Sequence, residues 1–189
     1  MGFYDSADGV DAYLRQADGY DGEELVEVFR RHLRDDSKVL ELGMGPGKDL
    51  DLLRLHYEVT GSDLSPAFLK RYQQRHPLAK LERVDAAQMD IDARFNGIYS
   101  NKVLIHLSPE ELADSLKHQR DKLSPAGILL HSFWTGTGSA QRSGLWFHQY
   151  TESVLRQLVP PGLHILELER YTEMEGEDSV FLVLQKRPF

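Results

Sequence analysis

The 189-residue chain contains no cysteine. Disulfide frameworks, thiolate metal sites and cysteine nucleophiles are therefore excluded. The chain also lacks an apolar run near the roughly 20 residues that span a bilayer, and Met1–Val10 lacks the basic and then apolar layout of a signal peptide. We accordingly expect a cytoplasmic protein that does not enter membranes.

Basic residues are outnumbered, because 22 Lys and Arg stand against 30 Asp and Glu and give a net charge of -8. Such a charge opposes attraction to a phosphate backbone or an anionic membrane surface, so nucleic acid is not an expected partner. The length suffices for one apolar core and is short for two full domains. We expect a single domain over 1–189, either monomeric or a homodimer.

Strand-like and helix-like segments alternate along the chain. Leu25, Val26, Phe29 and Leu33 recur at helical spacing, which predicts a helix over 23–33. We assign it to an N-terminal helical cap, 1–36, ahead of a core over 37–189. In that core, strands are expected at 38–42, 57–62, 81–84, 96–101, 128–134, 163–170 and 179–185, and helices at 49–57, after 65, at 108–122 and at 151–158.

This alternation predicts an α/β fold with a doubly wound, mainly parallel seven-stranded sheet and helices on both faces. The close final pair of strands predicts an antiparallel hairpin at one edge of the sheet. Residues 124–127 are expected to form a turn, and 135–143, rich in Gly, Ser and Thr, a surface loop.

Three acidic residues stand near the ends of expected strands. Glu41 lies at the end of the first strand, just ahead of the turn 43–47, Gly-Met-Gly-Pro-Gly, and Asp63 and Asp85 follow the second and third strands. In an open α/β sheet, ligands bind outside the carboxyl ends of the strands, near the point where strand order reverses. Because glycines permit a tight turn and close approach of a ligand to the backbone, these segments together predict one ligand cradle.

The segments 39–47 (Val-Leu-Glu-Leu-Gly-Met-Gly-Pro-Gly), 61–65 and 84–87 resemble successive motifs of class I S-adenosylmethionine-dependent methyltransferases, which have a Rossmann-like fold. The resemblance extends from about residue 38 onward. It is greatest to the small-molecule branch, of type 11 and type 25, whose segment after the fourth strand resembles 101–107. It implies S-adenosylmethionine as the cofactor and a small-molecule acceptor that is methylated on O, N or C by in-line displacement.

The same resemblance implies a set of cofactor-binding residues. The glycine turn receives the methionine moiety, whose ammonium group suits Glu41, while Asp63 accepts hydrogen bonds from the ribose and Asp85 from the adenine amino group. The backbone N–H groups next to Asp85 are expected to meet a ring nitrogen of the adenine. The full expected set is Glu41, Gly43, Met44, Gly45, Asp63, Leu64, Asp85, Ala86, Ala87, Asn101 and Lys102.

Two positions depart from the family pattern. Met44 stands where a small residue or cysteine is frequent, and Lys102 adds a cation beside the expected sulfonium region. For Lys102 we favour a side chain that points into solvent over one that binds an acidic substrate.

Two alternative functions remain open. An NAD-dependent oxidoreductase requires Gly or Ala three places after the second glycine of its fingerprint, where this chain has Lys48, and the charge of Glu41 disfavours a pyrophosphate there. A non-catalytic module of the same fold binds the cofactor, or nothing, on behalf of a partner protein. Such a module is expected to have lost residues of the cofactor motif, and this sequence shows no such loss.

Histidine is the expected general base when an acceptor must lose a proton near neutral pH. His106, after the fourth strand, is the candidate catalytic residue, and His148 is a weaker one. His131 lies within an apolar strand, which is typical of a hydrogen-bonded core histidine. We expect no metal site, because no histidines show the i, i+4 pairing of a helical metal motif.

Aromatic residues occur both ahead of the expected core and in its second half. Tyr4 and Tyr13 are candidates for a cap over the cofactor, although packing on a neighbouring helix is the commoner role. The aromatic stretch near Trp146 is expected to be core rather than pocket.

Overall fold

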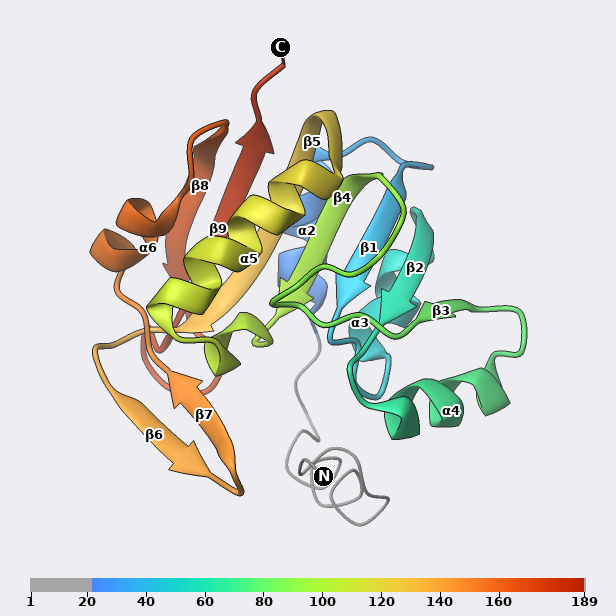
Figure 1. Ribbon diagram of the computed structural model, residues 1–189, viewed down its shortest axis with the longest axis horizontal. Helices are drawn as coiled ribbons and strands as arrows, with labels where there is room; N and C mark the ends of the chain where they lie inside the picture. Colours follow the sequence, from blue (N-terminus) through green and yellow to red (C-terminus); the bar gives the residue numbers. More distant parts are fainter. Residues whose placement is uncertain (1–21, 189) are drawn as a thin grey trace.

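The structure, a computed structural model, describes residues 22–188 (Figure 1). Its centre is a seven-stranded sheet in the order β3-β2-β1-β4-β5-β9-β8, in which β9 runs antiparallel to both of its neighbours and the other pairs are parallel. The predicted α/β fold with an antiparallel edge hairpin is therefore confirmed. The strands of this sheet are β1 Lys38–Leu42, β2 Glu58–Ser62, β3 Lys80–Glu82, β4 Phe95–Asn101, β5 Leu123–Trp134, β8 Leu163–Tyr171 and β9 Ser179–Lys186.

Helices cover both faces of the sheet, as Figure 1 shows for α5 in front and α2 behind. One apolar cluster joins the sheet to α5 (Pro109–Lys122) and α6 (Glu152–Leu158). A second cluster joins the opposite face to α2 (Glu23–His32), α3 (Lys48–Leu53) and α4 (Pro66–Arg75). No helix within 22–188 is long and apolar enough to cross a bilayer.

Helix starts follow local sequence signals. Ser65 accepts a hydrogen bond from the N–H of Phe68 ahead of a proline at the first helical position. Ser108 and Glu111 form a reciprocal capping box at the start of α5. These caps satisfy N–H groups that a helix cannot pair internally, so α4 and α5 begin where their sequences predict.

Helix α2 belongs to the layer that covers one face of the sheet. Its Phe29 lies edge-on to Tyr57, with ring centroids 5.7 Å apart, and 5.8 Å from the ring of Tyr99. Arg31 pairs with Glu167 on β8. The helix thus packs as a flank of the core, whereas Tyr4 and Tyr13, the proposed cap residues, lie outside the described residues.

The expectation of a loop over 135–143 is wrong in part. Strand β6 (Ser139–Arg142) pairs antiparallel with β7 (Leu145–His148) as a separate two-stranded hairpin. Figure 1 shows this hairpin projecting past the edge of the sheet where β1, β4 and β5 end. All four residues of β6 are exposed, so the strand lacks the apolar alternation by which strands are recognised.

The expected turn at 124–127 is an irregularity inside β5. The partners of β5 on β4 pass from Phe95–Leu123 to Gly97–Ile128, so several β5 residues have no partner, and Ala126 adopts a left-handed φ of 60°. A bulge of this kind bends one strand without ending it. The sequence predicted a change of chain direction at these residues, but did not predict that they belong to a continuous strand.

Gly47 occupies a position that no side chain fits. Its φ is 88°, and a Cβ there would lie 2.3 Å from the ring of Tyr72. We expect Gly47→Ala to lower the free energy of unfolding by about 2–5 kcal/mol, since left-handed strain and overpacking add. Gly176→Ala is the matched control, because its φ of 64° is similar and nothing lies within 4 Å. Equal losses in the two variants, measured by urea denaturation, would contradict the steric argument.

Candidate functional site

The carboxyl ends of the parallel strands meet at one edge of the sheet. Here β1 has β2 on one side and β4 on the other, so strand order reverses beside β1. The glycine turn after β1 lies at this point, with a φ of 63° at Gly43 and 50° at Gly45. A Cβ on Gly43 would lie 2.5 Å from the side chain of Val103. The turn therefore packs closely against the segment that follows β4.

Glu41 is a buried carboxyl at this edge. It is only 3% exposed, and its Oε2 has no hydrogen-bond partner among the described residues. Burial raises the pKa of Glu41 well above its ordinary value, and the charges of Asp49 and Asp63 raise it further. Because a buried unpaired carboxyl is unfavourable unless it meets a donor or a cation, this group is suited to a cationic ligand.

Asp63, after β2, contacts the glycine turn directly. Its Oδ2 accepts a hydrogen bond from the N–H of Gly45 at 2.9 Å, and its Oδ1 accepts one from the N–H of Ser65 at 2.8 Å. Desolvation raises the pKa of Asp63, and these two hydrogen bonds oppose the rise. The fold thus brings Gly45 and Asp63 together, as the cradle hypothesis requires.

Asp85 follows β3 and organises its own loop. Its Oδ1 accepts a hydrogen bond from the N–H of Ala87 at 2.8 Å, and the carbonyl of Ala86 accepts one from Ser115. The N–H of Ala87 is therefore engaged with Asp85 rather than directed at a ligand. Leu64, another expected site residue, is 51% exposed at the start of the neighbouring loop, and Met44 is buried within the turn.

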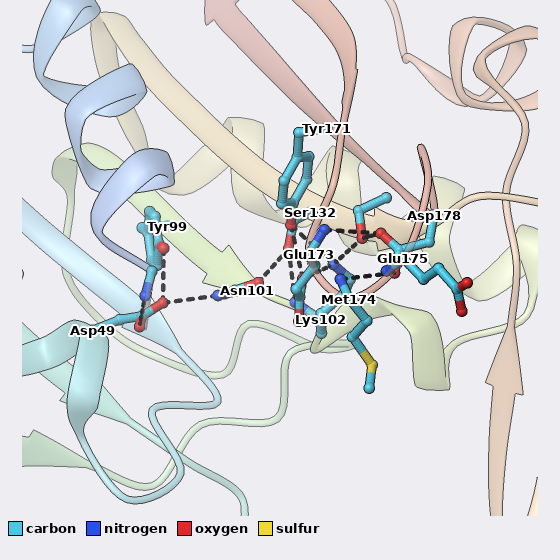
Figure 2. Close-up of polar contacts among 12 residues, drawn as sticks. Asp49, Tyr99, Asn101, Lys102, Ser132, Tyr171, Glu173, Met174, Glu175 and Asp178 are labelled. Atoms are coloured by element: carbon cyan, nitrogen blue, oxygen red, sulfur yellow. Dashed lines mark hydrogen bonds and ion pairs between the residues drawn. The ribbon is translucent and has the colours of Figure 1, made fainter. Parts of the chain in front are cut away.

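Asp49 was not recognised from the sequence. Figure 2 shows it at one end of a series of polar contacts: its Oδ2 accepts hydrogen bonds from the Tyr99 hydroxyl at 2.7 Å and from Asn101 Nδ2 at 3.1 Å. Its Oδ1 accepts one from the N–H of Gly22 at 3.1 Å. An acid early in a helix is usually explained by its favourable interaction with the helix dipole. The position of Asp49 two residues after Gly47 is the only sequence signal for a further role.

Lys102 points inward, so the favoured solvent-facing orientation is wrong. Its side chain is 11% exposed, and its Nζ donates to the carboxylate of Glu173, to Tyr171 Oη at 2.9 Å and to Ser179 Oγ at 3.0 Å (Figure 2). The ammonium also lies 4.1 Å from the ring centroid of Trp134. Burial lowers the pKa of Lys102, while the charge of Glu173 raises it. These partners come from the far end of the chain, which local sequence patterns do not reveal.

His106 lies in a short 3-10 helix, Leu104–His106, against the β6–β7 hairpin. Its Nδ1 is 2.7 Å from the backbone carbonyl of Trp146, and its ring lies edge-on to Phe147 with centroids 4.7 Å apart. Burial lowers the pKa of His106. Since a carbonyl only accepts, Nδ1 carries the proton and the neutral ring keeps its lone pair on Nε2.

His131 is a core residue of β5. It is fully buried, its Nδ1 is 2.8 Å from Ser100 Oγ, and burial lowers its pKa to about 3. These contacts agree with the expected structural role. His148, the weaker base candidate, stacks on Trp146 in the hairpin. Trp146 is 49% exposed, so the expected core position is wrong for this residue, whereas Tyr150 of the same stretch is buried in the core and Phe147 packs against it.

A glycine turn at the switch point of a seven-stranded sheet, with acids at or just after the ends of the first three strands and an antiparallel final hairpin, is typical of the class I methyltransferase fold. Residues 39–127 match the family described as "Methyltransferase domain". The matched segment, residues 39–127, therefore has the sequence features of a methyltransferase domain, on a fold that is shared with S-adenosylmethionine-dependent methyltransferases.

Known methyltransferases are similar to this chain in sequence or in fold. Trans-aconitate 2-methyltransferase of Methylobacterium nodulans is 29% identical over 120 residues, 62% of this chain and 46% of its own, so the match spans about half the length of that relative. The crystal structure of a SAM-dependent methyltransferase from Methanosarcina mazei superposes with a TM-score of 0.72 at 18% identity, covering 86% of this chain and 98% of its own. The structure of the glycopeptide N-methyltransferase MtfA complexed with S-adenosylhomocysteine also superposes with a TM-score of 0.72 at 18% identity, covering 96% of this chain and 98% of its own.

Proposed function

We propose that this protein transfers a methyl group from S-adenosylmethionine to a small-molecule acceptor. The observation that carries the proposal is the buried Oε2 of Glu41, which has no hydrogen-bond partner within residues 22–188 and lies beside a glycine turn whose Gly45 contacts Asp63. A phosphate-bearing ligand is repelled by such carboxylates, whereas an ammonium and a sulfonium are attracted. This charge pattern favours a cationic adenosyl cofactor over NAD.

The chain's own residues would divide the binding of that cofactor among them. Glu41 faces the ammonium of the methionine moiety, Asp63 accepts from the ribose hydroxyls, and Asp85 accepts from the adenine amino group. Since the N–H of Ala87 is engaged, we assign the contact with a ring nitrogen of the adenine to the N–H of Ala86. Asn101 stands at the end of β4, held in place by Asp49.

Bound S-adenosylmethionine supplies a methyl carbon activated by its positive sulfur. The protein's task is then to align the acceptor atom behind that carbon and to exclude water. The segment after β4 and the β6–β7 hairpin border the acceptor side, and His106 Nε2 accepts a proton when the acceptor must lose one. The relatives named above act on trans-aconitate and on glycopeptides, so their acceptor chemistry is not uniform.

The proposal is tested by calorimetry followed by a transfer assay. We expect S-adenosylmethionine and S-adenosylhomocysteine to bind and NAD to leave the melting temperature unchanged, and tritiated methyl to pass to at least one member of a metabolite panel. Tight cofactor binding with no transfer to any acceptor would favour a non-catalytic module. Stabilisation by NAD alone would contradict the proposal.

Glu41→Gln should have two opposite effects: it should stabilise the fold at high pH and weaken the binding of the cofactor. A buried carboxyl with a raised pKa favours folding when protonated, and this stability is lost as the pH rises from 4.5, the ordinary value, through the raised pKa. At pH 8 the variant should therefore unfold at a higher temperature than the wild type, by a few degrees for about 1–2 kcal/mol, and the gain should vanish near pH 4.

The same variant should bind S-adenosylhomocysteine about 10-fold to 100-fold more weakly, because a charge-assisted hydrogen bond to the ammonium is lost. Wild-type binding should release a proton, detectable by calorimetry in buffers of different ionisation enthalpy, and Glu41→Gln should release none. Loss of stability together with unchanged affinity would show that Glu41 is structural.

A further inference from the structure

The ammonium of Lys102 has several contacts with groups that the sheet holds in place and one contact, Glu173, on a connecting turn. Tyr171 ends β8 and Ser179 begins β9, so their hydroxyls are held by the antiparallel pairing of these two strands. The ring of Trp134 is held at the end of β5. Glu173, in contrast, lies on the turn that connects β8 to β9.

The turn that carries Glu173 keeps its shape independently of Lys102. The carboxylate of Asp178 accepts hydrogen bonds from the backbone N–H groups of Glu173, Met174 and Glu175. Met174 is 79% exposed. The hydrogen bonds to Asp178 hold the backbone of the turn, whereas the Glu173 side chain, 9% exposed, is held by Lys102 and by Tyr171 Oη at 3.1 Å. Displacement of this side chain would therefore cost these two contacts and leave the turn in place.

The backbone of Lys102 lies beside the expected cofactor cradle, and its side chain extends from there to Tyr171 and Ser179. The N–H of Lys102 donates to Ser132 Oγ at 3.0 Å, that hydroxyl donates to Asn101 Oδ1, and Asn101 donates to Asp49 (Figure 2). A chain of hydrogen bonds thus connects the Lys102 backbone to the helix that follows the glycine turn. The backbone of Lys102 also adopts a left-handed φ of 55°. Such a conformation is unfavourable for lysine and is found where function requires a particular side-chain direction.

We propose that Lys102 binds a carboxylate of the methyl acceptor, and that Glu173 holds the same place when no acceptor is bound. This inference rests on the proposed methyltransferase function and specifies its substrate class as organic acids. Exchange of one carboxylate for another keeps the buried ammonium paired, so the unfavourable state of a lone buried charge is avoided. The aromatic face of Trp134 keeps its cation–π contact throughout the exchange.

Trp134 supplies a direct readout, because the chain has two tryptophans and Trp146→Phe leaves Trp134 as the single one. We would titrate this background variant with trans-aconitate and, as a neutral match, with its trimethyl ester, in the presence and absence of S-adenosylhomocysteine. The expected result is a saturable change in Trp134 emission with the acid and none with the ester.

Two further substitutions in the same background separate binding from structure. Glu173→Gln removes the competing carboxylate and should tighten the apparent Kd for the acid about tenfold. Lys102→Met should weaken it about 10-fold to 100-fold. The double variant, Lys102→Met with Glu173→Gln, leaves no lone buried charge and should fold as the wild type does while giving no response. Each single variant leaves one buried charge unpaired and should lose stability in either case, so the affinity is the discriminating result: a merely structural ion pair predicts that Glu173→Gln does not tighten binding.

The inference is overturned if the acid gives no saturable signal, or if Glu173→Gln weakens the response as Lys102→Met does. Failure of the proposed function is recognised separately, since calorimetry would then show no binding of S-adenosylhomocysteine. The titrations without that ligand still report on Lys102 in that case.

Discussion

Asp63→Asn should weaken the binding of S-adenosylmethionine about 10²-fold to 10⁴-fold. The carboxylate is proposed to accept from both ribose hydroxyls, and each charge-assisted hydrogen bond contributes about 1.5–3 kcal/mol. The amide oxygen of Asn still accepts from one of the two backbone N–H groups that Asp63 now binds. The substitution therefore removes charge with little change in shape.

Calorimetry with S-adenosylhomocysteine measures this effect, and circular dichroism verifies that the fold is kept. Asp114→Asn is the control, because Asp114 is an exposed residue of α5 that pairs with Lys117. Its affinity should equal that of the wild type. An Asp63→Asn variant that binds as tightly as this control would refute the ribose assignment.

His106→Gln should lower kcat about 10²-fold for an acceptor that must lose a proton, at the lower end of what a general base contributes. Burial holds the pKa of His106 below its ordinary value of 6.5, so the ring is neutral at pH 7. As the pH falls through that lowered pKa, the ring gains a proton and the wild-type kcat should decline. The variant should lose this acid limb of the pH profile while its affinity for the cofactor stays the same.

A structural role for His106 makes a different prediction. Its Nδ1 contacts the hairpin at the Trp146 carbonyl, so a loosened hairpin would raise KM and leave the shape of the pH profile unchanged. His56→Gln is the matched control, because His56 precedes β2 at the opposite end of the sheet. Retention of the acid limb in His106→Gln would assign the proton transfer to another group.

The order of elements could be predicted from the sequence because its causes are local. Alternating hydrophobic periods distinguish strands from helices, and Ser65 and Ser108 mark helix starts through hydrogen bonds within four residues. The hairpin of β6 and β7 was missed because the four residues of β6 are all exposed and carry no such period. Strand β6 is stabilised by its hydrogen bonds to β7, and not by the strand propensity of its own residues.

The same distinction holds for the site. The glycine turn and the acids at the strand ends could be predicted from the sequence, since parallel strands of one sheet bring their carboxyl ends to a common edge. The contacts of Asp49 with Tyr99 and Asn101, and the inward direction of Lys102, could be seen only in the folded chain. The Lys102 partners Tyr171 and Glu173 lie 69 and 71 positions away. Such pairings depend on strand order and register, which arise from the packing of the whole chain.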